Sequence, residues 1–243
     1  LVLKLRQLGD VLLSVPVFRT LKAYFPQAHL AALVFAGTEG MLRGHPAVDE
    51  VIVFDRGWKD LNQWRRWVAE GQFLRDLRQR RFDLVVDLTG SDRAAWFAWL
   101  SGAKQRWGST LSQVGFWGKT RLFTQLARND GGIHIVRQNL AVVEQAGLKP
   151  VDYRVDYYPT TADKEEVQHW WATRGWQPED TIIHIHPTSH WFFKCWRDEA
   201  MAAVISWLLA QGIKVVLTAA PTPKETAKAA AILAQVKIRP ALA

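Results

Sequence analysis

The first 26 residues, LVLKLRQLGDVLLSVPVFRTLKAYFP (Leu1–Pro26), combine an apolar run, a short polar turn and an amphipathic segment. The run LVLKL predicts a strand and RQLGD a turn. The stretch from Val11 to about Tyr24 predicts a helix, with Pro16 near its first turns and Pro26 at its end. A strand that leads directly into a helix is the repeating unit of parallel α/β folds. The sequence therefore predicts a parallel sheet covered by helices.

The next 120 residues repeat this alternation of short β-branched runs and longer amphipathic segments. We expect strands at 29–35, 50–54 and 82–88, and helices at 38–43, 61–80, 94–100 and 134–146. Residues 102–132 are rich in Gly, Trp and basic side chains and predict an irregular connection. Together these elements predict one Rossmann-like domain.

A second series follows VDYRVDYYP (Val151–Pro159), which has no helical period and marks a domain boundary. The later segments predict helices at 162–174, 198–211 and 224–235 and strands at 181–186 and 214–218. We therefore expect two Rossmann-like domains, 1–155 and 156–243, whose parallel sheets face a cleft. The second has too few strands for a complete domain of this type, so we expect it to be incomplete, and we expect a few residues to precede Leu1.

Composition excludes several classes of protein. Hydrophobic residues make up 49% of the 243-residue chain, which excludes a disordered or fibrous protein. The longest apolar runs, Leu30–Ala36 and Ala94–Leu100, are too short to span a bilayer. The single cysteine, Cys195, excludes an internal disulfide and any thiolate cluster. With no secretion leader recognisable at the start, we expect a cytoplasmic protein.

The net charge of +8 is confined to one part of the chain. Residues 1–150 hold 21 Lys and Arg against 13 Asp and Glu, whereas residues 151–243 hold ten of each. Positive charge is densest in Arg56–Arg81 and in Ser101–Arg128, which has five basic residues and no acidic one. This asymmetry predicts either an anionic partner for the first domain or simply a soluble basic surface.

The turn LGD (Leu8–Asp10) lies where a strand meets a helix, the position at which open α/β sheets bind ligands. Gly9 permits close backbone approach, and Asp10 falls at the expected helix N-cap. Two interpretations remain open for Asp10: a structural cap, or a general base that faces the cleft. The absence of a GxGxxG pattern and of a Walker pattern argues against dinucleotide and nucleoside triphosphate binding.

A second polar loop, HPTSHWFFKCWRDE (His186–Glu199), also follows an expected strand. The hydroxyls of Thr188 and Ser189, the Lys194 cation and the start of the next helix together indicate a diphosphate site. Alternatively, the aromatic residues of the loop belong to a core and Lys194 is simply exposed. His184 and His186 share a strand face but have no suitably spaced carboxylate or thiolate, so we expect no metal. Nothing marks Cys195 as a nucleophile.

Four segments in order resemble the heptosyltransferases of lipopolysaccharide core biosynthesis, most closely their heptosyltransferase III branch. They are LKLRQLGDVLLSVPVFRTLKAYFP, DLVVDLTGSDRAA, HIVRQNLAVVEQAGL and HPTSHWFFKCWRDEAMAAVI. The resemblance runs from Leu1 to about Ala220. It implies a GT-B glycosyltransferase that transfers heptose from ADP-heptose to the lipopolysaccharide inner core with inversion, and it implies no cofactor.

The resemblance also implies roles for individual residues. Asp10 matches the catalytic aspartate of the family's GD turn. The donor diphosphate is implied to bind Thr188, Ser189 and Lys194, in the 156–243 domain. The acceptor is implied to bind the 1–155 domain near Arg93, His134 and Arg137, and charge adds Arg65 and Arg66 as preferred acceptor contacts. The family's later Asp-Ser/Thr-Gly loop with its histidine is not found in this sequence.

The implied acceptor is a phosphorylated lipid A-core at the anionic inner face of the inner membrane. Peripheral contact with this acceptor and this surface would account for the positive charge of the first domain. Two other interpretations of the function remain open. One is a nucleic-acid-binding α/β module, whose patch would be formed by Trp64, Trp67 and the arginines 65, 66, 75, 78, 80 and 81. The other is a GT-B enzyme that uses another nucleotide sugar.

Overall fold

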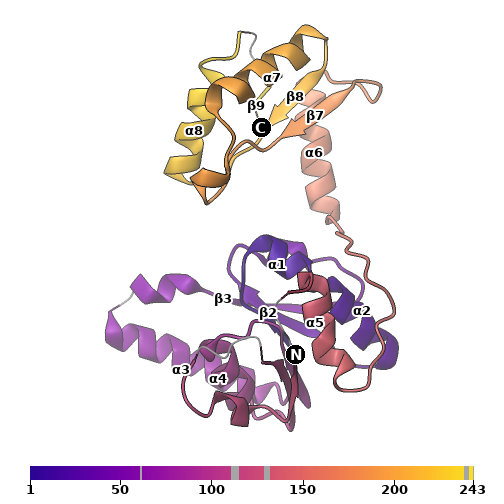
Figure 1. Cartoon of the computed structure of the whole chain (residues 1–243), viewed down its shortest axis with the longest axis vertical. Helices are drawn as coiled ribbons and strands as arrows, with labels where there is room; N and C mark the ends of the chain where they lie inside the picture. Colours follow the sequence, from indigo (N-terminus) through magenta and orange to yellow (C-terminus); the bar gives the residue numbers. More distant parts are fainter. Residues whose placement is uncertain (61, 111–114, 129–131, 238–240, 243) are drawn as a thin grey trace. The chain divides into compact units, whose positions relative to one another are not determined.

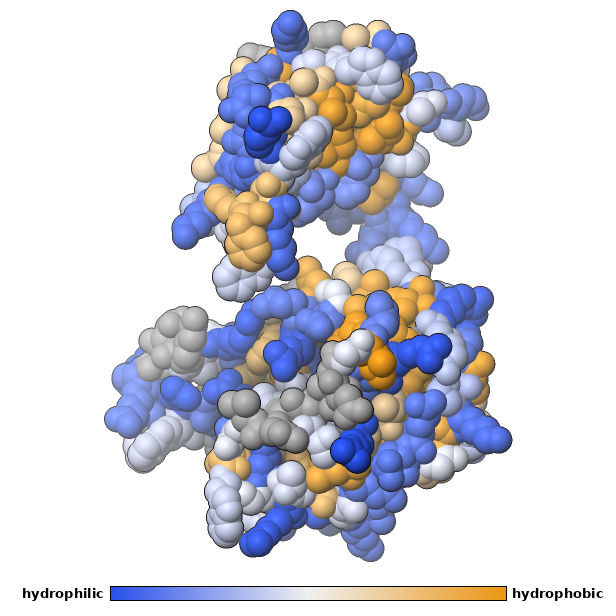
Figure 2. Space-filling model, viewed as in Figure 1, coloured by the Kyte–Doolittle hydropathy of each residue, from blue (hydrophilic) through white to orange (hydrophobic). Residues whose placement is uncertain are grey.

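The computed structural model describes residues 1–60, 62–110, 115–128, 132–237 and 241–242. The chain divides into two compact units, Leu1–Thr161 and Ala162–Ala243. Charged and polar side chains cover much of the face shown in Figure 2, with smaller apolar areas between them.

Unit 1 is built on a six-stranded parallel sheet of order β3-β2-β1-β4-β5-β6 (Figure 1). Its strands are β1 Val2–Lys4, β2 Ala31–Phe35, β3 Glu50–Phe54, β4 Leu84–Asp87, β5 Gln105–Ser109 and β6 Gln125–Ala127. Its helices are α1 Leu8–Leu12, α2 Val15–Tyr24, α3 Gln63–Gln79, α4 Asp92–Leu100 and α5 Ile135–Glu144. Short 3₁₀ turns lie at η1 Glu39–Met41, η2 Arg56–Asp60 and η3 Lys119–Leu122. The expected parallel α/β architecture is confirmed.

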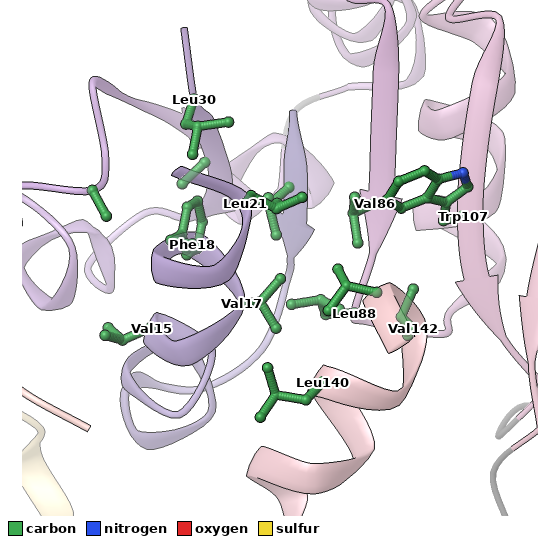
Figure 3. Packing of buried hydrophobic residues seen from close by; sticks show 14 of the residues in the cluster. Val15, Val17, Phe18, Leu21, Leu30, Val86, Leu88, Trp107, Leu140 and Val142 are labelled. Atoms are coloured by element: carbon green, nitrogen blue, oxygen red, sulfur yellow. The ribbon is translucent and has the colours of Figure 1, made fainter. Parts of the chain in front are cut away.

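Successive side chains along each strand point to opposite faces of the sheet, and they contribute to two separate hydrophobic cores. On one face, α2 and α5 pack against β1, β4 and β5, and Figure 3 shows Phe18 and Leu21 of α2 on the same side as Leu140 of α5. On the other face, α3 and α4 cover a core in which the Phe54 ring contacts Phe73 and Phe97. Strands buried on both faces explain the nearly continuous apolar runs of β1 and β2.

Two expectations for this unit are wrong. The single helix expected from Val11 to Tyr24 is divided into α1 and α2, because Pro16 lacks an N–H and fits only the first turn of a helix. The helix restarts at Ser14, whose hydroxyl donates to the Val11 carbonyl at 2.6 Å. The segment 38–43 forms only the turn η1.

The stretch 102–132, expected to be irregular, contains β5 and β6 within its described part. At Gly108 in β5, an added Cβ would lie 2.7 Å from the Phe123 ring, so this strand needs a glycine where the ring crosses it. The polar sequence of β5, QRWGS, buries little beyond Trp107 and Gly108, which is why its period is not apparent.

Unit 2 contains a smaller parallel sheet of order β7-β8-β9. Its elements are β7 Ile182–Ile185, η4 Phe192–Lys194, α7 Asp198–Ala210, β8 Lys214–Leu217, α8 Pro223–Leu233 and β9 Ala241–Leu242. Helix α6, Thr161–Thr173, spans the division between the units. Helices α7 and α8 bury Ile205 and Ile232 against Val215 of β8. The strand–helix alternation expected for this part of the chain is confirmed.

Candidate functional sites

The first candidate site lies at the carboxyl ends of β1 and β4. The chain leaves β1 toward β2 and leaves β4 toward β5, so the direction of the connections reverses between these two neighbouring strands. Such a switch point opens a crevice at the carboxyl edge of a parallel sheet, where α/β proteins bind ligands. The turn that carries Asp10 follows β1 directly.

Asp10 does not cap its helix. Helix α1 begins at Leu8 and Gln7 occupies the N-cap position, so the expected N-cap role of Asp10 is wrong. Its carboxylate lies in the first turn and is half-buried. Among the described residues it has no hydrogen-bond or ion-pair partner. The side chain is therefore available to accept a proton or a hydrogen bond from a ligand.

A buried lysine lies close to Asp10. Lys4, at the end of β1, is 2% exposed, and its Nζ donates to the Leu88 carbonyl and to Asn139 Oδ1, both at 2.9 Å. Burial lowers the pKa of Lys4 to about 8, while the negative charges of Asp10 and Asp87 oppose that shift. The site thus contains a preorganised cation close to the Asp10 carboxylate.

The turn after β4 is held by the buried carboxylate of Asp87. Its Oδ1 accepts from the backbone N–H groups of Thr89 at 2.8 Å and Gly90 at 3.3 Å, and burial raises its pKa to about 6. Its Oδ2 has no hydrogen-bond partner among the described residues. The Thr89 hydroxyl accepts from Leu5 N at 2.9 Å and donates to the Leu3 carbonyl at 3.2 Å. These bonds lock the two turns of the switch point together.

A cavity of about 230 Å³ opens between these turns and the start of α5. Its wall combines polar and apolar residues. They are Arg6, Leu88, Thr89, Gly90, Ser109, Ile135, Gln138, Asn139 and Val142. Arg6 Nη2 donates to the Thr89 carbonyl at 3.0 Å. Amide, hydroxyl and carbonyl groups at this density suit a ligand that is rich in hydroxyl groups.

The expected acceptor residues do not form one cluster. Arg65 and Arg66 lie in the first turns of α3, where Arg66 Nε donates to Glu70 Oε1 at 3.1 Å. Arg93 lies in the first turn of α4, with its guanidinium 5.1 Å from the centre of the Phe54 ring. These three arginines therefore belong to the helices on the face of the sheet opposite α5.

The structure does bring His134 and Arg137 together. His134 is the N-cap of α5, and its Nδ1 accepts from Val136 N at 3.3 Å. The Arg137 guanidinium lies 5.1 Å from the Tyr153 ring centre. Both side chains line a second cavity, of about 360 Å³, with Tyr153 and Val155. A cation and an aromatic ring on one wall suit an anionic or sugar ligand.

The second candidate site is the loop after β7 in unit 2. Thr188 is buried, Ser189 is half-buried and Lys194 is exposed in η4. Ser189 Oγ accepts from Trp191 N at 3.3 Å, which leaves its O–H free to donate. Among the described residues Lys194 has no hydrogen-bond or ion-pair partner, and its Nζ lies 5.9 Å from the Phe193 ring centre. The exposed pair Ser189 and Lys194 could hold an anion.

A chain of hydrogen bonds behind this loop includes residues that the sequence did not indicate. The Thr188 hydroxyl donates its single proton to Glu225 Oε2 at 2.7 Å. His186 Nε2 lies 3.4 Å from the same hydroxyl oxygen, and because that proton is already used, Nε2 is the donor in this second contact. His186 Nδ1 is then an acceptor for Thr218 Oγ1 at 2.9 Å, and His184 Nε2 donates to Thr218 at 2.7 Å. Glu225 and Thr218 thereby orient the loop. The only sequence signal for Glu225 is the capping pattern Thr222-x-x-Glu225.

The start of α7 carries two carboxylates of its own. Asp198 and Glu199 occupy its first turn, and Asp198 Oδ1 accepts from Lys228 Nζ. These carboxylates already complement the positive end of the helix dipole, so the loop side chains are the main expected contacts for a diphosphate. The contribution of this helix terminus stays a prediction.

Within the described ranges, no group of three or more His, Cys, Asp and Glu side chains is placed to hold a metal ion. A search of the same residues for a helix long and apolar enough to cross a membrane finds none.

Comparison with known proteins agrees with this arrangement. A relative from Escherichia coli K12, lipopolysaccharide heptosyltransferase 3, is 29% identical over 92% of this chain, and the chain spans 63% of that protein's length. The structure of a family 9 glycosyltransferase from Veillonella parvula superposes with a TM-score of 0.84 at 20% identity, covering 99% of this chain and 67% of the other. The E. coli heptosyltransferase WaaC with ADP-2-deoxy-2-fluoro heptose gives 0.74 at 18% identity, covering 97% and 73%. The model of glycosyltransferase family 9 (heptosyltransferase) matches residues 71–242, and the chain therefore belongs to this family.

Proposed function

We propose that the protein is an inverting glycosyltransferase that transfers heptose from ADP-heptose to the inner core of lipopolysaccharide. The observation that carries this proposal is the Asp10 carboxylate at the switch point of unit 1, half-buried and without a partner among the described residues. Membership of the heptosyltransferase family supports the choice of sugar. The name of the E. coli relative supports lipopolysaccharide as the acceptor class.

Asp10 acts as the general base in this proposal. As the acceptor hydroxyl attacks the anomeric carbon, its proton passes to the Asp10 carboxylate and a new C–O bond forms. The bond to the donor phosphate breaks on the opposite face, and ADP departs with the electron pair. A single displacement inverts the anomeric carbon and needs a base only on the acceptor side. Buried Lys4 places a positive charge close to the Asp10 carboxylate.

The departing ADP is stabilised by the loop after β7. Lys194 supplies a cation and Ser189 a free O–H donor, which together compensate the charge that develops on the diphosphate. Thr188 has a different role, because its hydroxyl donates its proton to Glu225 and thereby anchors the loop. It therefore has no proton to donate to the diphosphate, only an acceptor oxygen. We infer that Ser189 and Lys194 contribute most of the affinity for the diphosphate.

The acceptor binds unit 1. The excess positive charge of the first 150 residues complements a phosphorylated lipid A-core, and Arg65, Arg66, Arg93, His134 and Arg137 are the proposed contacts. Because these residues occupy two faces of the unit, we infer that the phosphates and the sugars of the acceptor bind different groups among them. The protein would work at the anionic inner surface of the inner membrane, with association weakened by salt.

A panel of nucleotides tests the donor class directly. Thermal unfolding of the protein is measured with ADP, UDP, GDP and NAD at equal concentration. A ligand at 100 times its Kd stabilises the folded state by about 2.7 kcal/mol, so ADP alone should raise the Tm. A rise with UDP or GDP in place of ADP would refute ADP-heptose as the donor.

A further inference from the structure

Three exposed tryptophans and the half-buried Phe116 lie on α4 and on the chain just before η3. The ring centres of Trp96 and Trp99 are 5.8 Å apart, and Phe116 stacks on Trp96 at 5.1 Å. Trp96, Trp99 and the adjacent Trp117 are 41%, 47% and 87% exposed. We call these four residues the aromatic patch. Large apolar rings gathered at one place on a surface indicate a binding partner.

The segment that carries Phe116 and Trp117 is held firmly against α4. Lys119 Nζ donates to the Gly90 carbonyl at 2.7 Å and lies 3.0 Å from Asp92 Oδ1. Gly115 fits tightly beside this ion pair, because an added Cβ would lie 2.4 Å from Asp92 Oδ1. The aromatic patch is therefore a preformed surface.

Cations flank the aromatic patch at both ends. The Arg121 guanidinium lies 5.1 Å from the Trp117 ring centre. At the other end, the Arg78 side chain lies beside Gly102, three residues after Trp99, and Lys104 is exposed close by in sequence. Asp92, one helical turn before Trp96 on α4, is compensated by Lys119. The combined surface is thus aromatic and positively charged.

We propose that the aromatic patch docks unit 1 on an anionic lipid bilayer, with the Trp rings in the headgroup region and the flanking cations against lipid phosphates. Trp is enriched at membrane–water interfaces, and basic residues near an anionic leaflet each add to the attraction. Single-stranded nucleic acid fits less well, since Phe116 already covers one face of Trp96, where a base would stack. The purpose of this docking, access to a membrane-anchored acceptor, rests on the proposed function.

Vesicle sedimentation tests the proposal on the whole protein. Vesicles of equal parts phosphatidylglycerol and phosphatidylethanolamine are compared with vesicles of phosphatidylcholine. We expect Trp117→Ala to weaken binding to the anionic vesicles about tenfold, given the apolar area of a Trp ring. Arg121→Gln should weaken it about fivefold, which corresponds to about 1 kcal/mol for one cation.

Matched variants away from the aromatic patch serve as controls. Trp207→Ala removes a ring that is 61% exposed on α7, and Lys164→Gln removes an exposed cation on α6. Both should bind anionic vesicles as the unmodified protein does, and all variants should keep its Tm. Equal losses in the control and patch variants would refute the proposal, as would unchanged binding by Trp117→Ala.

Two further measurements separate the alternatives. If the unmodified protein binds a single-stranded oligonucleotide but not the vesicles, and the patch variants lose affinity for the oligonucleotide, the partner is nucleic acid and the proposal is wrong. Stabilisation by ADP, measured on the same variants, should remain unchanged. Because ADP binding tests the proposed function and vesicle binding tests the aromatic patch, failure of one is distinguishable from failure of the other.

Discussion

Replacing the buried cation beside Asp10 tests the electrostatics of the switch point. In Lys4→Met, the ammonium of a 2% exposed side chain gives way to an apolar group of similar length. Burial lowers the pKa of Lys4 from 10.5 to about 8 in the folded protein. Between these two pH values the unfolded chain holds a proton that the folded protein releases, so stability rises with pH across this window.

The size of this rise follows from the shift in pKa. A change of one pKa unit corresponds to about 1.4 kcal/mol, so the ammonium costs the folded state about 3 kcal/mol below pH 8. Its bonds to the Leu88 carbonyl and to Asn139 offset that cost, because losing the donor leaves two buried acceptors unpaired, at about 1–3 kcal/mol each. The two effects have opposite signs and similar size at pH 7. The dependence on pH is therefore the informative quantity.

Urea unfolding at a series of pH values from 7.5 to 10.5 measures this dependence, through the midpoint and the m-value. We expect the unmodified protein to gain about 3 kcal/mol relative to Lys4→Met across the series. Lys149→Met, which removes an exposed lysine, should follow the unmodified protein. Parallel curves for the unmodified protein and Lys4→Met would show that Lys4 is not held as a costly buried cation.

Three further outcomes are expected. Lys194→Ala should weaken ADP binding about tenfold or more, because a charge-assisted bond to phosphate contributes ~1.5–3 kcal/mol, and unchanged affinity in calorimetry would remove Lys194 from the site. Thr188→Val should lower the free energy of unfolding by ~1–3 kcal/mol, since it leaves buried Glu225 without its hydrogen-bond donor. Thr188→Ser keeps the hydroxyl and should keep the stability of the unmodified protein; equal stability of the two variants would contradict this bond. Burial raises the pKa of Asp87 from 3.8 to about 6, so as pH rises from 4 to 6 the unmodified protein should lose about 2 kcal/mol of stability relative to Asp87→Asn. A difference that is independent of pH in urea titrations would contradict that assignment.

Much of the fold could be predicted from local patterns. The apolar runs of β1 and β2 and the amphipathic period of α5 depend on neighbouring residues, so they are legible in the sequence. The same holds for the position of Asp10, because a turn that follows the first strand lies at the carboxyl edge of a parallel sheet. Strand β5 escaped prediction because its sequence QRWGS is mostly polar and its Gly108 packs against Phe123, fifteen residues later in the chain.

The supporting residues of both sites could not be predicted from local patterns, because their partners are distant in the chain. Lys4 bonds to Asn139, 135 residues away, and Thr188 bonds to Glu225, 37 residues away. In the sequence, Lys4 is only a polar interruption of LVLKL, and Glu225 is only the third residue after a helix cap. Tertiary packing alone makes Lys4 a buried cation and Glu225 the acceptor that orients the loop.

Single-turnover transfer by Asp10→Asn tests the proposed chemistry most directly. The amide has nearly the size of the carboxylate but cannot accept the proton of the acceptor hydroxyl, and Asp10 has no hydrogen-bond partner among the described residues for the substitution to disturb. With ADP-heptose and a heptose-bearing core acceptor, we expect transfer to fall by ~10²–10⁴ while the Tm and ADP affinity stay unchanged. Transfer at the normal rate by this variant would contradict the assignment of Asp10 as the general base.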